Sequence, residues 1–229
     1  MTVKSLENNE LVNKVLQDPE APAILKKIAI ELEKEQEKRE QFYNSIKTEE
    51  YKTEFINGQV IIHSPVKKIH NDISSNLFML LNAYVAKYDL GFVGYEKIMI
   101  RLTRNDYEPD VCYFNKKKSK EFNDETSLFP PPNLAIEIAS PKTSARDRNV
   151  KYYDYERHGV DEYWIISPKE KIVEQYVLDK KSKSYKLKKK SESGNIELVS
   201  IKGLKFPIEC IFDRKLTQVE MIKILTYEK

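Results

Sequence analysis

The fold of this chain is decided by residues 134–166, which read LAIEIASPKTSARDRNVKYYDYERHGVDEYWII. The first six residues are apolar except for Glu137, a pattern typical of a strand that is buried on both faces of a sheet. A helix is predicted over residues 145–158, because Gly159 is a suitable C-cap, and the apolar run 163–166 predicts a second strand. Strand, helix and strand in this order predict a parallel βαβ unit in a mixed α/β fold with helices on a central sheet.

The segments on either side extend this fold. Asn57-Gly58 lies between two short apolar runs and predicts a hairpin over residues 54–62. The other predicted elements are helices over 67–88 and 214–226, strands over 92–102, 109–114, 196–201 and 206–208, and a hairpin formed by 172–178 and 184–188.

The N-terminal part differs from the rest in charge and texture. Residues 1–50 hold 8 basic and 11 acidic side chains, whereas the remaining residues hold 31 and 25. A helix with a broken apolar stripe is predicted over 21–45. We therefore predict a helical extension over residues 1–48, which packs on the body or pairs with a second copy, and a domain over residues 49–229.

Composition excludes several classes of site. The 229 residues include 2 Cys and 6 Gly, so a disulfide scaffold, a cysteine-rich zinc site and glycine-rich nucleotide loops are excluded. No apolar run approaches the roughly 20 residues of a membrane span, and the first residues lack the apolar region of a signal peptide. We expect a cytoplasmic protein that does not contact a membrane.

Two carboxylates are candidates for chemistry. Glu137 lies inside an apolar strand, where a carboxylate costs several kcal/mol unless it pairs with a cation, so it forms a structural ion pair or binds a metal. Asp110 follows Pro109 at a strand start, which is either an ordinary strand entry or a way to aim the side chain at the sheet edge. If the two strands are neighbours, these hard oxygen ligands suit Mg²⁺ or Mn²⁺.

The helix after Glu137 offers a basic partner. Asp147, Lys151 and Tyr155 are spaced i, i+4 and i+8 and share one face. Lys151 either forms a salt bridge with Asp147 or points at the carboxylate pair, where it could orient an attacking water and offset negative charge on a phosphoryl group. Lys142 is the alternative lysine for that role.

The arrangement resembles the Uma-type restriction endonuclease family of the PD-(D/E)XK nuclease superfamily. The resemblance rests on motifs in a fixed order and covers roughly residues 50–178, more weakly to about 210. These motifs are Glu54-Phe55-Ile56-Asn57-Gly58, Ser64-Pro65 with His70, Pro109-Asp110, Glu137-Ile138-Ala139-Ser140-Pro141, and Asp147, Lys151 and Tyr155 followed by 159–164.

The resemblance implies a restriction-endonuclease-like core, a central mixed sheet flanked by helices. It implies that Asp110 and Glu137 bind a divalent metal with the Ile138 carbonyl as a third ligand, and that Glu54 and His70 are accessory residues. The superfamily's usual lysine stands two residues after the Glu, where this chain has Ala139, and Lys151 takes its place in the family pattern. This departure leaves open which lysine has the functional role.

Two functions follow from these residues. The first is a metal-dependent endonuclease that hydrolyses DNA with Mg²⁺ or Mn²⁺ through Asp110, Glu137 and Lys151. The alternative is a catalytically inactive nuclease fold that binds nucleic acid or a protein partner. The lysines of residues 116–120 and 179–190 are either solvated or neutralise phosphates along the DNA backbone.

Overall fold

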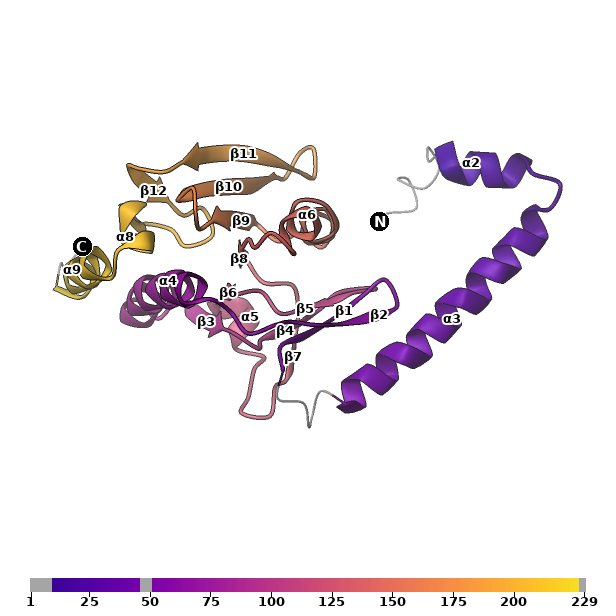
Figure 1. Cartoon of the computed structure of the whole chain (residues 1–229), viewed down its shortest axis with the longest axis horizontal. Coiled ribbons are helices and arrows are strands. Elements are labelled where there is room, and N and C mark those ends of the chain that lie inside the picture. The colour runs from indigo at the N-terminus through magenta and orange to yellow at the C-terminus, as the bar shows by residue number, and fades with distance from the viewer. Residues whose placement is uncertain (1–9, 46–50, 227–229) are drawn as a thin grey trace. The chain divides into compact units, whose positions relative to one another are not determined.

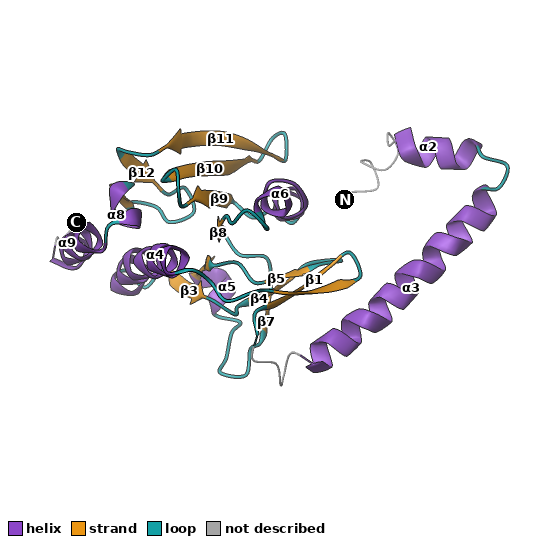
Figure 2. Ribbon diagram, in the orientation of Figure 1, coloured by secondary structure: helices purple, strands orange, loops and turns teal. Residues whose placement is uncertain are grey.

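A computed structural model describes residues 10–45 and 51–226 (Figure 1). Two compact units, Met1–Ile62 and His63–Lys229, make up the chain. The predicted boundary between residues 48 and 49 lies outside the described residues. Helices and strands are mixed in both units (Figure 2), which confirms the predicted α/β class with an N-terminal helical segment. Within the described ranges, no helix combines the length and apolarity needed to cross a membrane.

In the first unit, the end of a long helix packs on a hairpin. The Phe42 and Phe55 rings lie 5.7 Å apart between centroids. Asn57 and Gly58 have φ values of 50° and 77°, as a two-residue type I′ turn requires. The predicted helix and hairpin are both confirmed. The elements are α2 (Glu10–Gln17), α3 (Ala21–Ser45), β1 (Thr53–Ile56) and β2 (Gln59–Ile62).

Helix α3 exposes an apolar stripe. Leu25, Ile28 and Leu32 recur at helical spacing and are all exposed. The pairing of this helix with a second copy stays a prediction.

The second unit is built on a six-stranded sheet with the order β11-β10-β9-β8-β6-β3. The neighbours β8 and β9 are parallel, and the other neighbours in this sheet are antiparallel. The parallel pair confirms the predicted βαβ unit. The strands are β3 (Gly91–Tyr95), β6 (Val111–Asn115), β8 (Leu134–Ile138), β9 (Glu162–Ser167), β10 (Ile172–Asp179) and β11 (Ser184–Ser191).

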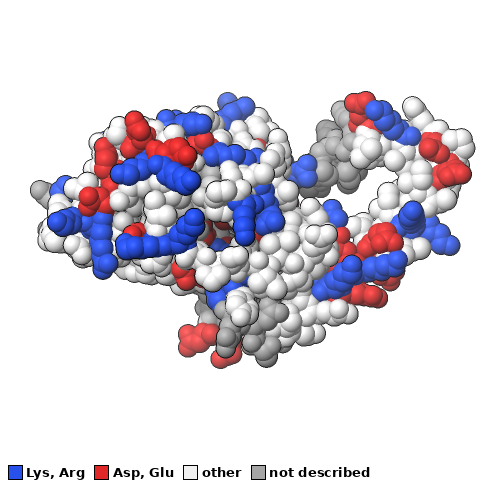
Figure 3. All heavy atoms as spheres, in the orientation of Figure 1, with Lys and Arg blue, Asp and Glu red and all other residues white. Residues whose placement is uncertain are grey.

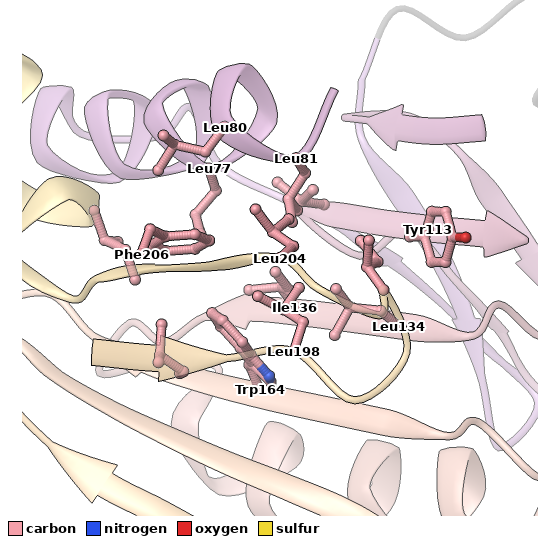
Figure 4. Packing of buried hydrophobic residues seen from close by; sticks show 14 of the residues in the cluster. Leu77, Leu80, Leu81, Tyr113, Leu134, Ile136, Trp164, Leu198, Leu204 and Phe206 are labelled. Carbon is pink, nitrogen blue, oxygen red and sulfur yellow. The ribbon is translucent and has the colours of Figure 1, made fainter. Parts of the chain in front are cut away.

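One face of this sheet carries the main core. Leucines of α4 pack with Ile136, Trp164 and Phe206, as Figure 4 shows. Side chains alternate along a strand, so Glu137, the neighbour of the core residues Ile136 and Ile138, points to the opposite face. The core face is covered by α4 (Lys68–Lys87), β12 (Asn195–Glu197), β13 (Lys205–Pro207), α8 (Glu209–Phe212) and α9 (Arg214–Thr226).

The helical segment between β8 and β9 has three parts. Its middle is a π-helical turn, η1, where the sequence predicts continuous helix. The order is α6 (Ser144–Arg146), η1 (Asp147–Lys151) and α7 (Tyr152–Arg157). This segment presents Lys151 to the sheet face that carries Glu137.

The single strand predicted over residues 92–102 is wrong. Glu96 and Lys97 have φ values of 48° and 40°, so the chain turns between β3 and β4. Strand β4 then pairs with β5 and β7 rather than with the six-stranded sheet. The remaining elements are β4 (Met99–Arg101), β5 (Asp106–Tyr107), α5 (Lys116–Ser119) and β7 (Leu128–Phe129).

A fully buried carboxylate ties β9 to the chain after β12. Oε1 of Glu162 accepts hydrogen bonds from Trp164 Nε1 at 2.7 Å and Gln175 Nε2 at 2.6 Å. Its Oε2 accepts from the backbone amides of Val199 and Ser200 and from the Ser200 hydroxyl, each at 2.8 Å. The carboxylate is thus held by N–H and O–H donors rather than by an ion pair.

We expect Glu162→Gln to lower the free energy of unfolding by about 2–4 kcal/mol, because an amide nitrogen would face backbone N–H donors and the charge-assisted bonds would be lost. Urea unfolding measures this loss. The matched control is Glu197→Gln, an exposed residue on β12, for which we expect a change within about 0.5 kcal/mol. Equal losses in the two variants would contradict the structural role of Glu162.

Candidate active site

Asp110 and Glu137 lie close together at one end of the strand pair formed by β6 and β8. Asp110 directly precedes β6, and Val111 of β6 pairs with Ile136 of β8, so Asp110 reaches the end of β8 that carries Glu137. The Asp110 amide donates to the Ile136 carbonyl at 3.1 Å, and the Ile138 amide donates to Asp110 Oδ2 at 2.8 Å. Both carboxylates are buried. Two residues 27 positions apart in the printed sequence therefore form one acidic pair.

Glu137 is bound by the helical segment above it. Lys151 Nζ lies 2.9 Å from Glu137 Oε1, and the Tyr155 hydroxyl donates to the same oxygen at 3.3 Å. Asp147 Oδ1 lies 3.8 Å from Lys151 Nζ. The structure thus brings Lys151 and Tyr155 to Glu137, with Asp147 beside Lys151, although η1 is π-helical. Such π turns occur frequently at functional sites.

The other predicted residues lie at different places. His70, in the first turn of α4, has Nε2 3.1 Å from Asp110 Oδ1. Lys142 is exposed in the turn before α6, so Lys151 is the lysine that the structure places on Glu137. Glu54 is buried on β1, in the first unit, and its part in this site stays a prediction.

Two residues near Lys151 were not identified from the sequence. Lys151 Nζ lies 5.5 Å from the centre of the Tyr107 ring, close enough for a cation–π contact. The Tyr107 hydroxyl donates to Asp154 Oδ2 at 2.6 Å. Burial, and then the charge of Asp154, raise the pKa of Tyr107, so its hydroxyl stays a donor. The sequence offered only their positions as a sign of a role at this site. Tyr107 stands three residues before Asp110, and Asp154 stands three residues after Lys151.

The oxygen donors at this site fit a hard divalent cation. In the described ranges, no group of three or more His, Cys, Asp or Glu side chains is placed to hold a metal, so a backbone ligand is needed beside Asp110 and Glu137. The N–H and C=O groups of one residue in a strand point to the same side. The Ile138 N–H points at Asp110, so the Ile138 carbonyl also points to the side of Asp110. Two carboxylates with a carbonyl suit Mg²⁺ or Mn²⁺.

Comparison with known proteins agrees with this fold. The family model described as "Uma2: Putative restriction endonuclease" matches residues 39–209. A crystal structure of a "putative nuclease belonging to DUF820" from Anabaena variabilis ATCC 29413 is similar to this chain with a TM-score of 0.60. The two share 19% identity, over 70% of this chain and 89% of the other, which shows a common fold. No curated protein matches the chain.

Removing the Lys151 ammonium should destabilise the protein, because the buried Glu137 carboxylate then lacks this cation. We expect Lys151→Met to lower the free energy of unfolding by about 3–5 kcal/mol, because a buried carboxylate loses its cation. Adding Glu137→Gln should recover at least about 1 kcal/mol, since that negative charge is then gone. Urea unfolding of both variants in a metal chelator measures this coupling, and a double variant less stable than Lys151→Met would contradict it.

Proposed function

Since this chain belongs to the Uma2 family, whose description is "Putative restriction endonuclease", we propose that it is a divalent-metal-dependent endonuclease that hydrolyses phosphodiester bonds of DNA. The observation that carries the proposal is the buried pair of Asp110 and Glu137 with Lys151 on Glu137. A pair of buried carboxylates is an arrangement that a hard divalent cation binds.

The charge of this cluster supports a cation ligand. Asp110, Glu137 and Asp147 are all buried, and Lys151 is the buried lysine among them. Carboxylate oxygens are the ligands that a hard divalent cation prefers, and a buried site strengthens their attraction to it. A divalent ion bound by Asp110, Glu137 and the Ile138 carbonyl would offset the negative charge of the two carboxylates. When bound, such an ion supplies Lewis-acid polarisation of the phosphate and a water of lowered pKa.

The residues of the chain provide the positioning. Lys151 and Tyr155 hold the Glu137 carboxylate in one orientation through Oε1. The Lys151 charge then lies beside the reacting phosphate, where it offsets negative charge that develops during hydrolysis. His70, in contact with Asp110 Oδ1, orients the other carboxylate. The Tyr107 ring, 5.5 Å from Lys151 Nζ, stabilises the charge of the lysine.

The second candidate is a nuclease fold that binds nucleic acid or a protein without cleaving it. The observation in its favour is Ala139, at the position where a strand lysine is expected from the superfamily pattern. Under this alternative the contact between Lys151 and Glu137 is a structural ion pair. Cleavage assays separate the two functions.

The direct test is cleavage of supercoiled and linear DNA in Mg²⁺ or Mn²⁺. We expect the protein to cleave DNA and Asp110→Asn to lose roughly 100-fold or more of the rate, because a neutral amide is a poor ligand for a hard cation. The matched control is Asp89→Asn, an exposed aspartate in the same unit that pairs with Lys116, which should cleave at the normal rate. Equal cleavage by Asp110→Asn and the unaltered protein would refute the proposal.

A second pair of variants identifies the functional lysine. Lys151→Gln should lower the cleavage rate at saturating DNA by roughly 100-fold, whereas Lys142→Gln, at an exposed position, should leave it unchanged. Circular dichroism establishes that each variant is folded, and Lys151→Arg, which keeps the charge, should recover part of the rate. Loss of activity in Lys142→Gln with full activity in Lys151→Gln would reverse the assignment.

A further inference from the structure

A straight row of residues crosses the central sheet from the candidate active site to its edge. Glu137 of β8 pairs with Ile165 of β9, Ile165 pairs with Glu174 of β10, and Glu174 pairs with Lys190 of β11. Residues paired laterally across a sheet project from the same face. Glu174 is two strand spacings from Glu137, a distance of about 10 Å.

Glu174 holds two cations at that end of the row. Lys190 Nζ lies 2.8 Å from Glu174 Oε1, and Arg148 donates from Nη1 to Oε2. The Tyr176 hydroxyl donates to Oε2 at 3.0 Å. Burial alone would raise the pKa of Glu174, but the hydrogen bonds from Lys190, Arg148 and Tyr176 lower it below its ordinary value. The carboxylate is thus an ionised anchor between two basic side chains.

The Arg148 and Lys190 side chains are accessible to solvent, whereas the Glu174 side chain between them is buried. The Glu174 side chain is 5% exposed, the Arg148 side chain 34% and the Lys190 side chain 55%. The cluster therefore presents one net positive charge on a pre-ordered arginine and lysine. Figure 3 shows Lys and Arg side chains interspersed with Asp and Glu side chains over the part of the molecule where β10 and β11 lie. Arginine carries five N–H donors in a rigid fork, so Arg148 can serve both Glu174 and an anionic ligand.

We propose that Arg148 and Lys190, held by Glu174, form a phosphate subsite for the DNA backbone beside the scissile bond. The inference rests on the proposed function for its substrate. Arg148 and Lys151 both belong to η1, so one helical turn supplies the cation at each end of the row. The roughly 10 Å between Glu137 and Glu174 corresponds to about three axial steps of 3.4 Å along one strand of DNA. Because successive phosphates are farther apart in space than their axial step, three is an upper bound, and the bound phosphate is one to three nucleotides from the bond that is cut.

The test is the salt dependence of DNA binding by the full chain, measured with a fluorescent duplex in a metal chelator so that no cleavage occurs. Each duplex phosphate that is neutralised contributes about 0.9 to the slope of log affinity against log salt. We expect Arg148→Gln with Lys190→Gln to lower that slope by about 1 and to weaken binding roughly tenfold. The matched control is Lys223→Gln on α9, which removes a lysine paired with Glu220 at 2.9 Å and should change neither quantity. A folded double variant with unaltered slope and affinity would overturn the subsite.

A scan of neutral methylphosphonate linkages locates the subsite. One linkage placed one to three nucleotides from the cut bond should weaken binding by the unaltered protein, and the double variant should be insensitive to the same linkage. Equal weakening of both proteins at every position would also overturn the inference, as would a protein that fails to bind DNA. A protein that binds with the expected slope but never cleaves in Mn²⁺ would refute the proposed function and leave the subsite standing.

Discussion

Burial of the Glu137 carboxylate within an apolar strand is the constraint on which the rest of this structure depends. A carboxylate in that position is costly unless donors and a cation surround it. Lys151 and Tyr155 meet this need from the helical segment above, and Asp110, directly before β6, adds a second carboxylate that accepts from the Ile138 amide. The acidic pair is therefore set by the pairing of β6 with β8, and its lysine by the helical segment that closes the βαβ unit.

The π-helical turn connects this centre with the edge of the sheet. η1 supplies Lys151 to Glu137 and Arg148 to Glu174, and the two carboxylates are aligned through Ile165. The paired strands fix the distance between Glu137 and Glu174, and one helical turn carries both Lys151 and Arg148. The two cations therefore have a fixed separation. Under the proposed function, this separation lets one element engage the reacting phosphate and a neighbouring phosphate together. Pre-ordered groups of this kind lose little entropy when they bind substrate.

The elements with strong local signals could be predicted from the sequence, whereas long-range partners could not. Helical periodicity identified the helices at 21–45 and 214–226, and Asn57-Gly58 identified the hairpin. Glu137 was noticed because its apolar neighbours made it anomalous. The turn at Glu96 and Lys97 was missed, since neither residue type signals a positive φ. Tyr107, Asp154 and Glu174 were missed because their roles depend on strand register and on helix placement, which leave no mark on the adjacent sequence.

Calorimetric titration with Mn²⁺ tests the central claim most directly, since it asks whether the buried acidic pair is a metal site independently of any DNA substrate. We expect the unaltered protein to bind about one Mn²⁺ and Asp110→Asn and Glu137→Gln each to weaken this binding at least tenfold, with exposed Asp89→Asn unaffected. Binding of equal strength in all four proteins, or no binding in any of them, would contradict it.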